Sequence, residues 1–357
     1  PAATFIAYNY NTPVDVNQFE KEAKQILSEV EKECGWMYET QHTVSGVVQK
    51  DQKGNPIIGK INYTVWSDVF ICPNCSGEII FWNCAVNKEE SKVNDKFPCP
   101  NCKAELTKRT MERARKTKYD PYIDESIKQA KQVPVLMNYT VTVSGKQKRF
   151  EKEPDKWDLE LIEKIEKTPI PYWIPTYRMP EGYNTEQPKK SHGITHVHHF
   201  YTKRNLWVLS LIENKRARLI RSAMTARSSK LVKTLMSNYF EHCKGKSRGG
   251  WAGTPLMGTL YAPSISTEPS PLEQIKSRTD SINNLNIFKF EYINEIFPIF
   301  CNSTTNILLI KNNSIDYIFT DPPFGGNIMY SELSFLWESW LKVFTNNKSE
   351  AVVNNSQ

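Results

Sequence analysis

Two segments of the chain repeat one short pattern, Cys72-Pro73-Asn74-Cys75 and Cys99-Pro100-Asn101-Cys102. A Cys-x2-Cys turn presents two thiolates from one tight loop, and two such turns complete the tetrahedron of sulfur ligands that a zinc ion prefers. The residues between them include a strand-forming run at 78–82, which a ribbon needs. Because all four ligands are cysteines, no coordination position is left for a substrate. The pattern therefore predicts a structural zinc ribbon over residues 68–106.

The cysteine usage also bears on the cellular compartment. Four of the eight cysteines fall into these two pairs, and the first residues lack the basic and apolar stretches of a secretory signal. This combination favours metal binding in a reducing compartment, the cytoplasm, over disulfides. Cys84 lies between the pairs without a partner, and we interpret it as a buried thiol.

Length and charge set the wider limits. With 357 residues the chain can form two domains, or one large domain with an insertion. A net charge of +7 permits a polyanionic partner without requiring one. Lysine and arginine crowd residues 103–118 and 203–233, which are interpreted either as solvated helical faces or as surfaces that contact phosphate. No apolar run is long enough to cross a bilayer.

Hydrophobic periodicity and turn residues give a coarse map of the elements. Apolar residues at three- and four-residue steps predict a first helix over 14–35, and β-branched runs around Lys53-Gly54-Asn55 predict hairpins within 36–82. The further expected elements are helices at 104–130, 155–167, 206–243 and 271–282, strands at 133–143 and 257–262, a proline-rich extended loop at 168–190 and a polar connector at 263–270.

The last part of the sequence suggests a catalytic site. Residues 314–320 are expected to form a short buried strand that ends in Asp321-Pro322-Pro323-Phe324, and a helix is expected over 332–343. Ligands of open α/β sheets bind at the carboxyl ends of strands, so this position is where chemistry is expected.

These four residues suit methyl transfer to an exocyclic amino group of a base. The lone pair of such a nitrogen is delocalised, and two acceptors aimed at its N–H groups favour a nucleophilic, tetrahedral nitrogen. The Asp321 carboxylate and the Pro322 carbonyl are the expected acceptors, and Pro323 helps to fix the backbone. Phe324 offers a face on which an extruded base can stack.

The order strand, Asp-Pro-Pro-Phe, glycine and helix resembles the catalytic motif of the amino-methyltransferases that modify adenine N6 or cytosine N4 in DNA, such as those of restriction-modification systems. The resemblance implies a Rossmann-like α/β fold, the cofactor S-adenosylmethionine and a DNA partner. Aspartate in the first position of the motif favours adenine N6. An RNA enzyme acting on guanine N2 of tRNA also fits, particularly at Gly325, and a non-catalytic zinc-ribbon module that binds nucleic acid is a third interpretation.

The resemblance also implies how the chain is organised. Residues 1–7 are similar to the segment directly after the ribose-binding acidic residue in this family, so we expect the cofactor loop upstream of Pro1 and expect this chain alone to be inactive. Asn306 and Asp321 are the expected cofactor contacts in the chain. The expected parts are an edge of the methyltransferase core at 1–12, a helix and hairpin insertion at 13–67, the ribbon at 68–106, a mixed insertion that could recognise the target at 107–284, and the catalytic half at 285–357.

A cluster of histidines and a basic loop remain. His192, His196, His198 and His199 lie within eight residues, but their spacing fits no familiar closed metal site. We interpret this region instead as a loop and helix entry in which Lys203 and Arg204 contact phosphate. Lys246 and Arg248 lie in a glycine-containing loop that is either a basic contact to nucleic acid or a plain connector.

Overall fold

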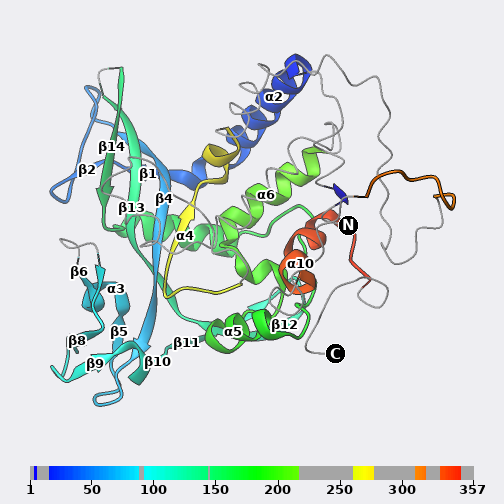
Figure 1. Ribbon diagram of the computed structural model, residues 1–357. Helices are drawn as coiled ribbons and strands as arrows, with labels where there is room; N and C mark the ends of the chain where they lie inside the picture. The colour runs from blue at the N-terminus through cyan, green and yellow to red at the C-terminus, as the bar shows by residue number, and fades with distance from the viewer. Residues whose placement is uncertain are drawn as a thin grey trace.

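The structure is a computed structural model, and it describes residues 4–5, 16–87, 92–143, 145–216, 260–276, 310–318 and 330–346. These residues form a mixed α/β fold in which helices pack beside an antiparallel sheet (Figure 1). The named helices are α2 (Val16–Cys34), η1 (Gly35–Tyr38), α3 (Phe81–Ala85), η2 (Lys108–Thr110), α4 (Lys156–Lys167), α5 (Tyr183–His192), η3 (Val197–Phe200), α6 (Lys203–Arg216) and α10 (Tyr330–Leu341). None of the described helices has the length and apolar character needed to cross a membrane.

Most strands are short, and the two longest are β4 with 14 residues and β13 with 12 residues. In chain order they are β1 (Glu39–Gln41), β2 (Thr43–Val44), β3 (Val47–Val48), β4 (Ile58–Ile71), β5 (Glu78–Ile80), β6 (Val86–Asn87), β7 (Lys92–Val93), β8 (Lys96–Pro98), β9 (Glu105–Thr107), β10 (Glu112–Arg113), β11 (Arg115–Asp120), β12 (Glu125–Ala130), β13 (Gln132–Val143), β14 (Lys146–Lys152) and β15 (Ile265–Pro269).

Strand β4 is the centre of the sheet. It pairs with β1 near its start, with β13 and β15 along its middle, and with β5 and β10 at its end, while β14 extends the sheet beyond β13. Every strand pair among the described residues is antiparallel. The parallel sheet of a Rossmann-like fold is therefore not observed in this part of the chain, and that fold stays a prediction.

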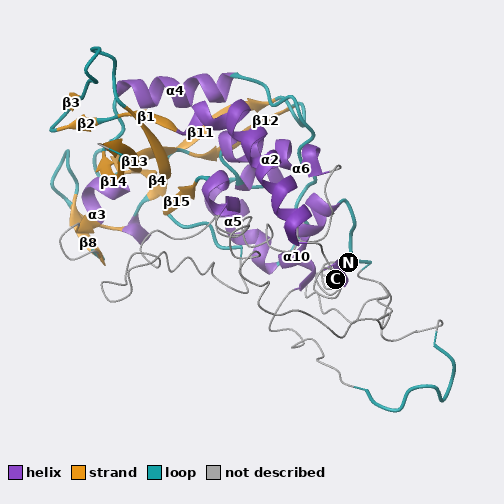
Figure 2. Cartoon of the chain, turned by 90° about the horizontal axis from the view of Figure 1, so that it is seen from above, coloured by secondary structure: helices purple, strands orange, loops and turns teal. Residues whose placement is uncertain are grey.

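Two apolar clusters hold the described fold together. Helix α2 buries Phe19, Ala23, Ile26, Val30 and Cys34, which recur at three- and four-residue steps, and the last three belong to the first cluster together with residues of α6 and α10. Figure 2 shows α2, α6 and α10 gathered on one side of the strands. The second cluster lies beside the cysteine pairs and joins the far end of β4 to α3 and β8.

Several local predictions are confirmed. The expected first helix and the helices at 155–167 and 332–343 are observed as α2, α4 and α10, and the expected strand at 133–143 is β13. Asp155 caps α4 by accepting a hydrogen bond from the backbone N–H of Asp158 at 3.1 Å. The hairpin β2–β3 turns at Ser45 and Gly46, both with positive φ, and Gly54 turns the next loop with φ 83°.

Two predicted elements are wrong in type. Residues 104–130 were expected to be helical, but they form β9, η2, β10 and the hairpin β11–β12, because their charged side chains reach solvent from paired strands and no continuous apolar helical stripe exists to bury. Residues 263–270 were expected to be a polar connector, but they contain β15. This segment is a strand because it pairs with β4, and its buried Glu268 is held by Arg204.

Two further predictions were wrong in part. The proline-rich stretch 168–190, expected to be an extended loop, contains the start of α5, with Pro188 inside the helix.

Residues 314–318 are the described part of the expected catalytic strand. They form no strand, and Ile315, Tyr317 and Ile318 are 52%, 80% and 74% exposed. Among the residues the structure describes, no strand pairs with this segment. The described part of the expected helix 206–243 lies in α6, and that of 271–282 is helical at 271–276.

Candidate functional site

Each Cys-x2-Cys segment is the turn of a short antiparallel hairpin. The first lies between β4 and β5, and the second lies between β8 and β9. Both turns close in the same way: Ser76 N–H donates to the Cys72 carbonyl at 2.9 Å, and Lys103 N–H donates to the Cys99 carbonyl at 3.0 Å. Ser76 and Lys103 have positive φ values of 55° and 63°, which bend the chain back after the second cysteine of each turn.

The four sulfur atoms converge. Sγ of Cys72 lies 3.8 Å from Sγ of Cys102, Sγ of Cys75 lies 3.9 Å from Sγ of Cys99, and all four lie within 4.8 Å of one another. Cys72 and Cys99 are buried, whereas Cys75 and Cys102 face solvent. The cluster can hold a metal ion, and its four thiolates are compatible with zinc.

The hairpin backbone prepares the cluster for a cation. Hydrogen bonds from the backbone N–H groups of Cys102 and Asn101 lower the pKa of Cys99 to about 6. The backbone N–H of Ala104 lowers the pKa of Cys102, but burial and the neighbouring sulfur atoms together raise it to about 11. The thiolate is the form of cysteine that binds a metal, and Cys99 is the member of this pair that ionises first.

Close packing fixes the two hairpins against each other. A side chain at Gly77 would place its Cβ 2.4 Å from Nδ2 of Asn101 in the opposite turn, so the two turns approach each other closely there. Phe81 packs on Phe97 with ring centroids 5.8 Å apart, which joins α3 to β8. Cys84, interpreted as a buried thiol, is half-buried and lies outside the cluster; burial raises its pKa.

The predicted catalytic residues Asp321, Pro322, Pro323 and Phe324 and the predicted cofactor contact Asn306 lie outside the described residues. The same holds for Lys246 and Arg248 of the basic loop. The helix that comes after the motif is described, and its position can be stated.

Helix α10 is anchored to the core by polar contacts with α5. Glu332 is 1% exposed, and its Oε2 accepts a hydrogen bond from the backbone N–H of Asn184 at 2.6 Å. The N–H of Asn184 lies in the first turn of α5 and has no acceptor within that helix, so the Glu332 carboxylate supplies one. A helix N-terminus also favours a negative charge nearby. Nε1 of Trp340 donates to the hydroxyl of Tyr201 at 3.1 Å. The described helix that follows the motif in the sequence therefore belongs to the folded body of the chain.

The two predicted phosphate contacts in α6 differ in environment. Lys203 is partly exposed and donates from Nζ to the Glu166 carbonyl at 2.5 Å. Arg204 is 3% exposed, and its guanidinium binds both carboxylate oxygens of Glu268 at 2.7 and 2.5 Å. A side chain held inside the protein in this way does not reach a phosphate, so the prediction for Arg204 is corrected: it is an internal structural cation.

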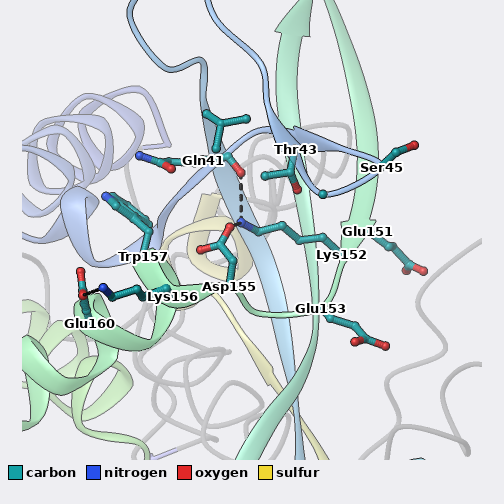
Figure 3. A pocket seen from close by; sticks show the side chains of 12 residues that line it. Gln41, Thr43, Ser45, Glu151, Lys152, Glu153, Asp155, Lys156, Trp157 and Glu160 are labelled. Atoms are coloured by element: carbon teal, nitrogen blue, oxygen red, sulfur yellow. Dashed lines mark hydrogen bonds and ion pairs between the residues drawn. The ribbon is translucent and has the colours of Figure 1, made fainter.

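A surface pocket between β1, β14 and α4 is also unsuited to phosphate (Figure 3). Its one buried cation, Lys152, is neutralised, because Nζ lies 2.6 Å from Oδ2 of Asp155, 2.8 Å from Oδ2 of Asp158 and 3.0 Å from the Gln41 carbonyl. Glu151, Glu153 and Glu160 also line the pocket and outnumber its exposed cation, Lys156, so the lining is acidic and would repel an anion.

The four clustered histidines separate into two groups. His192 contacts the buried Asp68, which also binds Arg113 at 2.6 Å. His198 and His199 instead meet Asp120, with His196 beside them. Sequence reasoning missed Asp120, because no local pattern links it to a segment almost eighty positions later.

Comparison of the chain with protein-family models, with curated proteins and with solved structures finds no match. The functional argument therefore depends on the residues of the chain itself.

Proposed function

We propose that the chain is part of an S-adenosylmethionine-dependent methyltransferase that modifies an exocyclic amino group of a nucleic-acid base, adenine N6 in DNA before other targets, and that its four-cysteine cluster holds a structural zinc ion. The observation that carries the first half is the motif Asp321-Pro322-Pro323-Phe324. The anchoring of α10, which begins six residues after Phe324, supports it, because a catalytic turn needs a fixed helix behind it.

The residues of the motif have different roles in the proposed reaction. The Asp321 carboxylate and the Pro322 carbonyl accept hydrogen bonds from the amino group, which localises its lone pair and stabilises the positive charge that grows on nitrogen. Asp321 then takes the proton that the methylated nitrogen loses. S-adenosylmethionine supplies an electrophilic methyl group on a sulfonium. Phe324 holds the extruded base by stacking.

The zinc ion has a structural role in this proposal. Four thiolates fill its coordination sphere, so no position remains for water or substrate. The ion would add a bonded link between the hairpin β4–β5 and the hairpin β8–β9, beside the apolar cluster that already joins them.

The test is methyl transfer by the full-length protein that contains this chain. Labelled S-adenosylmethionine is supplied with duplex DNA or with tRNA, and incorporation is compared between wild type, Asp321→Ala and Asp316→Ala. Asp316 is a matched control, because it is an exposed aspartate five residues before the motif. We expect incorporation into DNA adenine that Asp321→Ala abolishes and Asp316→Ala leaves unchanged.

The other outcomes are equally informative. Incorporation into tRNA guanine would replace the DNA target by the RNA target. Nucleic-acid binding without transfer, in protein that retains zinc and binds S-adenosylmethionine, would contradict the enzymatic proposal and favour a zinc-ribbon binding module.

A further inference from the structure

Three side chains from distant parts of the sequence meet in the interior beside the hairpin β11–β12. Asp120 ends β11, and His198 and His199 lie on η3. Oδ2 of Asp120 lies 2.7 Å from Nε2 of His198 and 2.9 Å from Nε2 of His199. The three side chains are 6%, 5% and 3% exposed, and their possible ligand atoms all lie within 4.8 Å of one another.

The protonation states of this group suit a cation. Burial lowers the pKa of both histidines, that of His199 to about 4, so both rings are neutral at pH 7. Burial alone would raise the pKa of Asp120, but the hydrogen bonds from His198 and His199 hold it below its usual value, so the carboxylate is ionised. Neutral imidazoles and an ionised carboxylate are the forms that coordinate metals.

The backbone holds these residues in place. Tyr122 N–H donates to Oδ1 of Asp120 at 3.0 Å, which fixes the carboxylate. The histidine segment pairs with residues 177–179: Met179 N–H donates to the Thr195 carbonyl at 2.9 Å, and Val197 N–H donates to the Tyr177 carbonyl at 3.0 Å. A ligand set on paired backbone keeps its geometry better than one on a free loop.

The second nitrogens of the two rings differ. Nδ1 of His199 accepts a hydrogen bond from the backbone N–H of Thr195 at 3.4 Å, and it lies equally far from the Thr195 hydroxyl, which can accept a hydrogen bond from Nδ1–H when Nε2 binds a metal. Nδ1 of His198 is buried and has no hydrogen-bond partner among the described residues.

We propose that Asp120, His198 and His199 form a second metal site, separate from the four cysteines, for a divalent transition-metal ion of the Zn²⁺ type. Two imidazoles and one carboxylate favour such ions over Mg²⁺ and Ca²⁺, which prefer oxygen ligands alone. Tetrahedral bonds of about 2.0–2.2 Å separate ligand atoms by roughly 3.3 Å, so Oδ2 of Asp120, at 2.7 and 2.9 Å from the two Nε2 atoms, would need to move away from them by about half an ångström.

This second site differs chemically from the cysteine cluster. Three protein ligands leave a coordination position for water, as in catalytic zinc sites, whereas four thiolates leave none. His199 also lines a cavity of about 130 Å³, together with Thr202 and Glu268. The proposal does not depend on the methyltransferase function, since its ligands lie outside the Asp-Pro-Pro-Phe motif.

The test counts metal ions in the purified full chain after saturation with Zn²⁺ and removal of free ion. We expect two ions per chain in wild type and one in Asp120→Asn and in His199→Asn. His196→Asn is the matched control, because His196 lies in the same segment but outside the ligand set, and it should keep two ions. One ion per wild-type chain, or two in His199→Asn, would overturn the proposal.

Titration with Co²⁺ keeps the test decisive if a variant folds poorly. Thiolate ligands give charge-transfer absorption that imidazole and carboxylate ligands lack. In wild type, this absorption should saturate after one equivalent, while the visible d–d bands continue to grow with the second. Both signals saturating together at one equivalent would contradict a second site, and a normal thiolate signal in His199→Asn verifies that the variant is folded.

Discussion

Replacing Arg204 by methionine tests whether this cation is an internal part of the fold. Besides its two bonds to Glu268, the guanidinium donates to the hydroxyl of Thr64 at 2.6 Å. The variant leaves Glu268, which is 3% exposed, with the donors Trp66 and Thr202. Breaking a buried ion pair from one side costs about 3–5 kcal/mol. Because two donors to Glu268 remain, we expect a loss near the lower end, about 3 kcal/mol.

The measurement is the free energy of unfolding from urea titrations followed by circular dichroism. Lys203→Met is the neighbouring control and should cost less than about 1 kcal/mol, because Lys203 is partly exposed and binds a single carbonyl. The double variant Arg204→Met with Glu268→Gln should lose less than Arg204→Met alone, because no unpaired charge stays buried. The reasoning fails if Arg204→Met and Lys203→Met cost the same, or if the losses in the double variant simply add.

Three further predictions use other parts of the fold. Gly182→Ala should lower stability by about 1–3 kcal/mol and lower methyl transfer, since its Cβ would lie 2.1 Å from Oε1 of Glu332 and displace α10; thermal melts and the transfer assay check this. Chelation of zinc, or Cys99→Ser, should lower the melting temperature, and added zinc should restore it only in wild type. Burial alone would raise the pKa of Asp68, but His192 and Arg113 hold it below its usual value. The carboxylate therefore contributes to the free energy of unfolding above about pH 4, and this contribution is lost as the pH falls through the lowered pKa. In urea titrations at a series of pH values, Asp68→Asn should weaken the loss of stability at acidic pH.

The features predicted correctly from the sequence are those encoded within a few residues. The apolar spacing of α2, the helix α4 that begins after Asp155 and the turn at Gly54 each depend on neighbours along the chain. The cysteine cluster is of the same kind, because each pair forms its own turn and only the meeting of the two turns is long-range.

The features that the sequence did not predict depend on contacts between residues far apart in the chain. Strand β15 is polar and was not predicted, since its hydrogen bonds come from β4, about two hundred positions earlier. The start of α5 is capped by Glu332 and not by a residue of its own segment, so nothing in the proline-rich stretch indicates it. Asp120 likewise became a candidate ligand only when folding brought it to His198 and His199.

Contacts between buried charges also connect parts of the chain that the sequence presents as separate. Strand β4 ends at the first cysteine pair, and its Asp68 is buried against His192 at the end of α5. The start of α5 in turn holds Glu332 of α10, the helix that comes after the proposed catalytic motif. A metal ion bound by the four cysteines would order the end of β4, and through Asp68 and α5 it would stabilise the position of α10. A closed site of four thiolates takes no direct part in the chemistry. In the proposed methyltransferase, this gives the proposed zinc ribbon a structural role that does not depend on contact between the ribbon and nucleic acid.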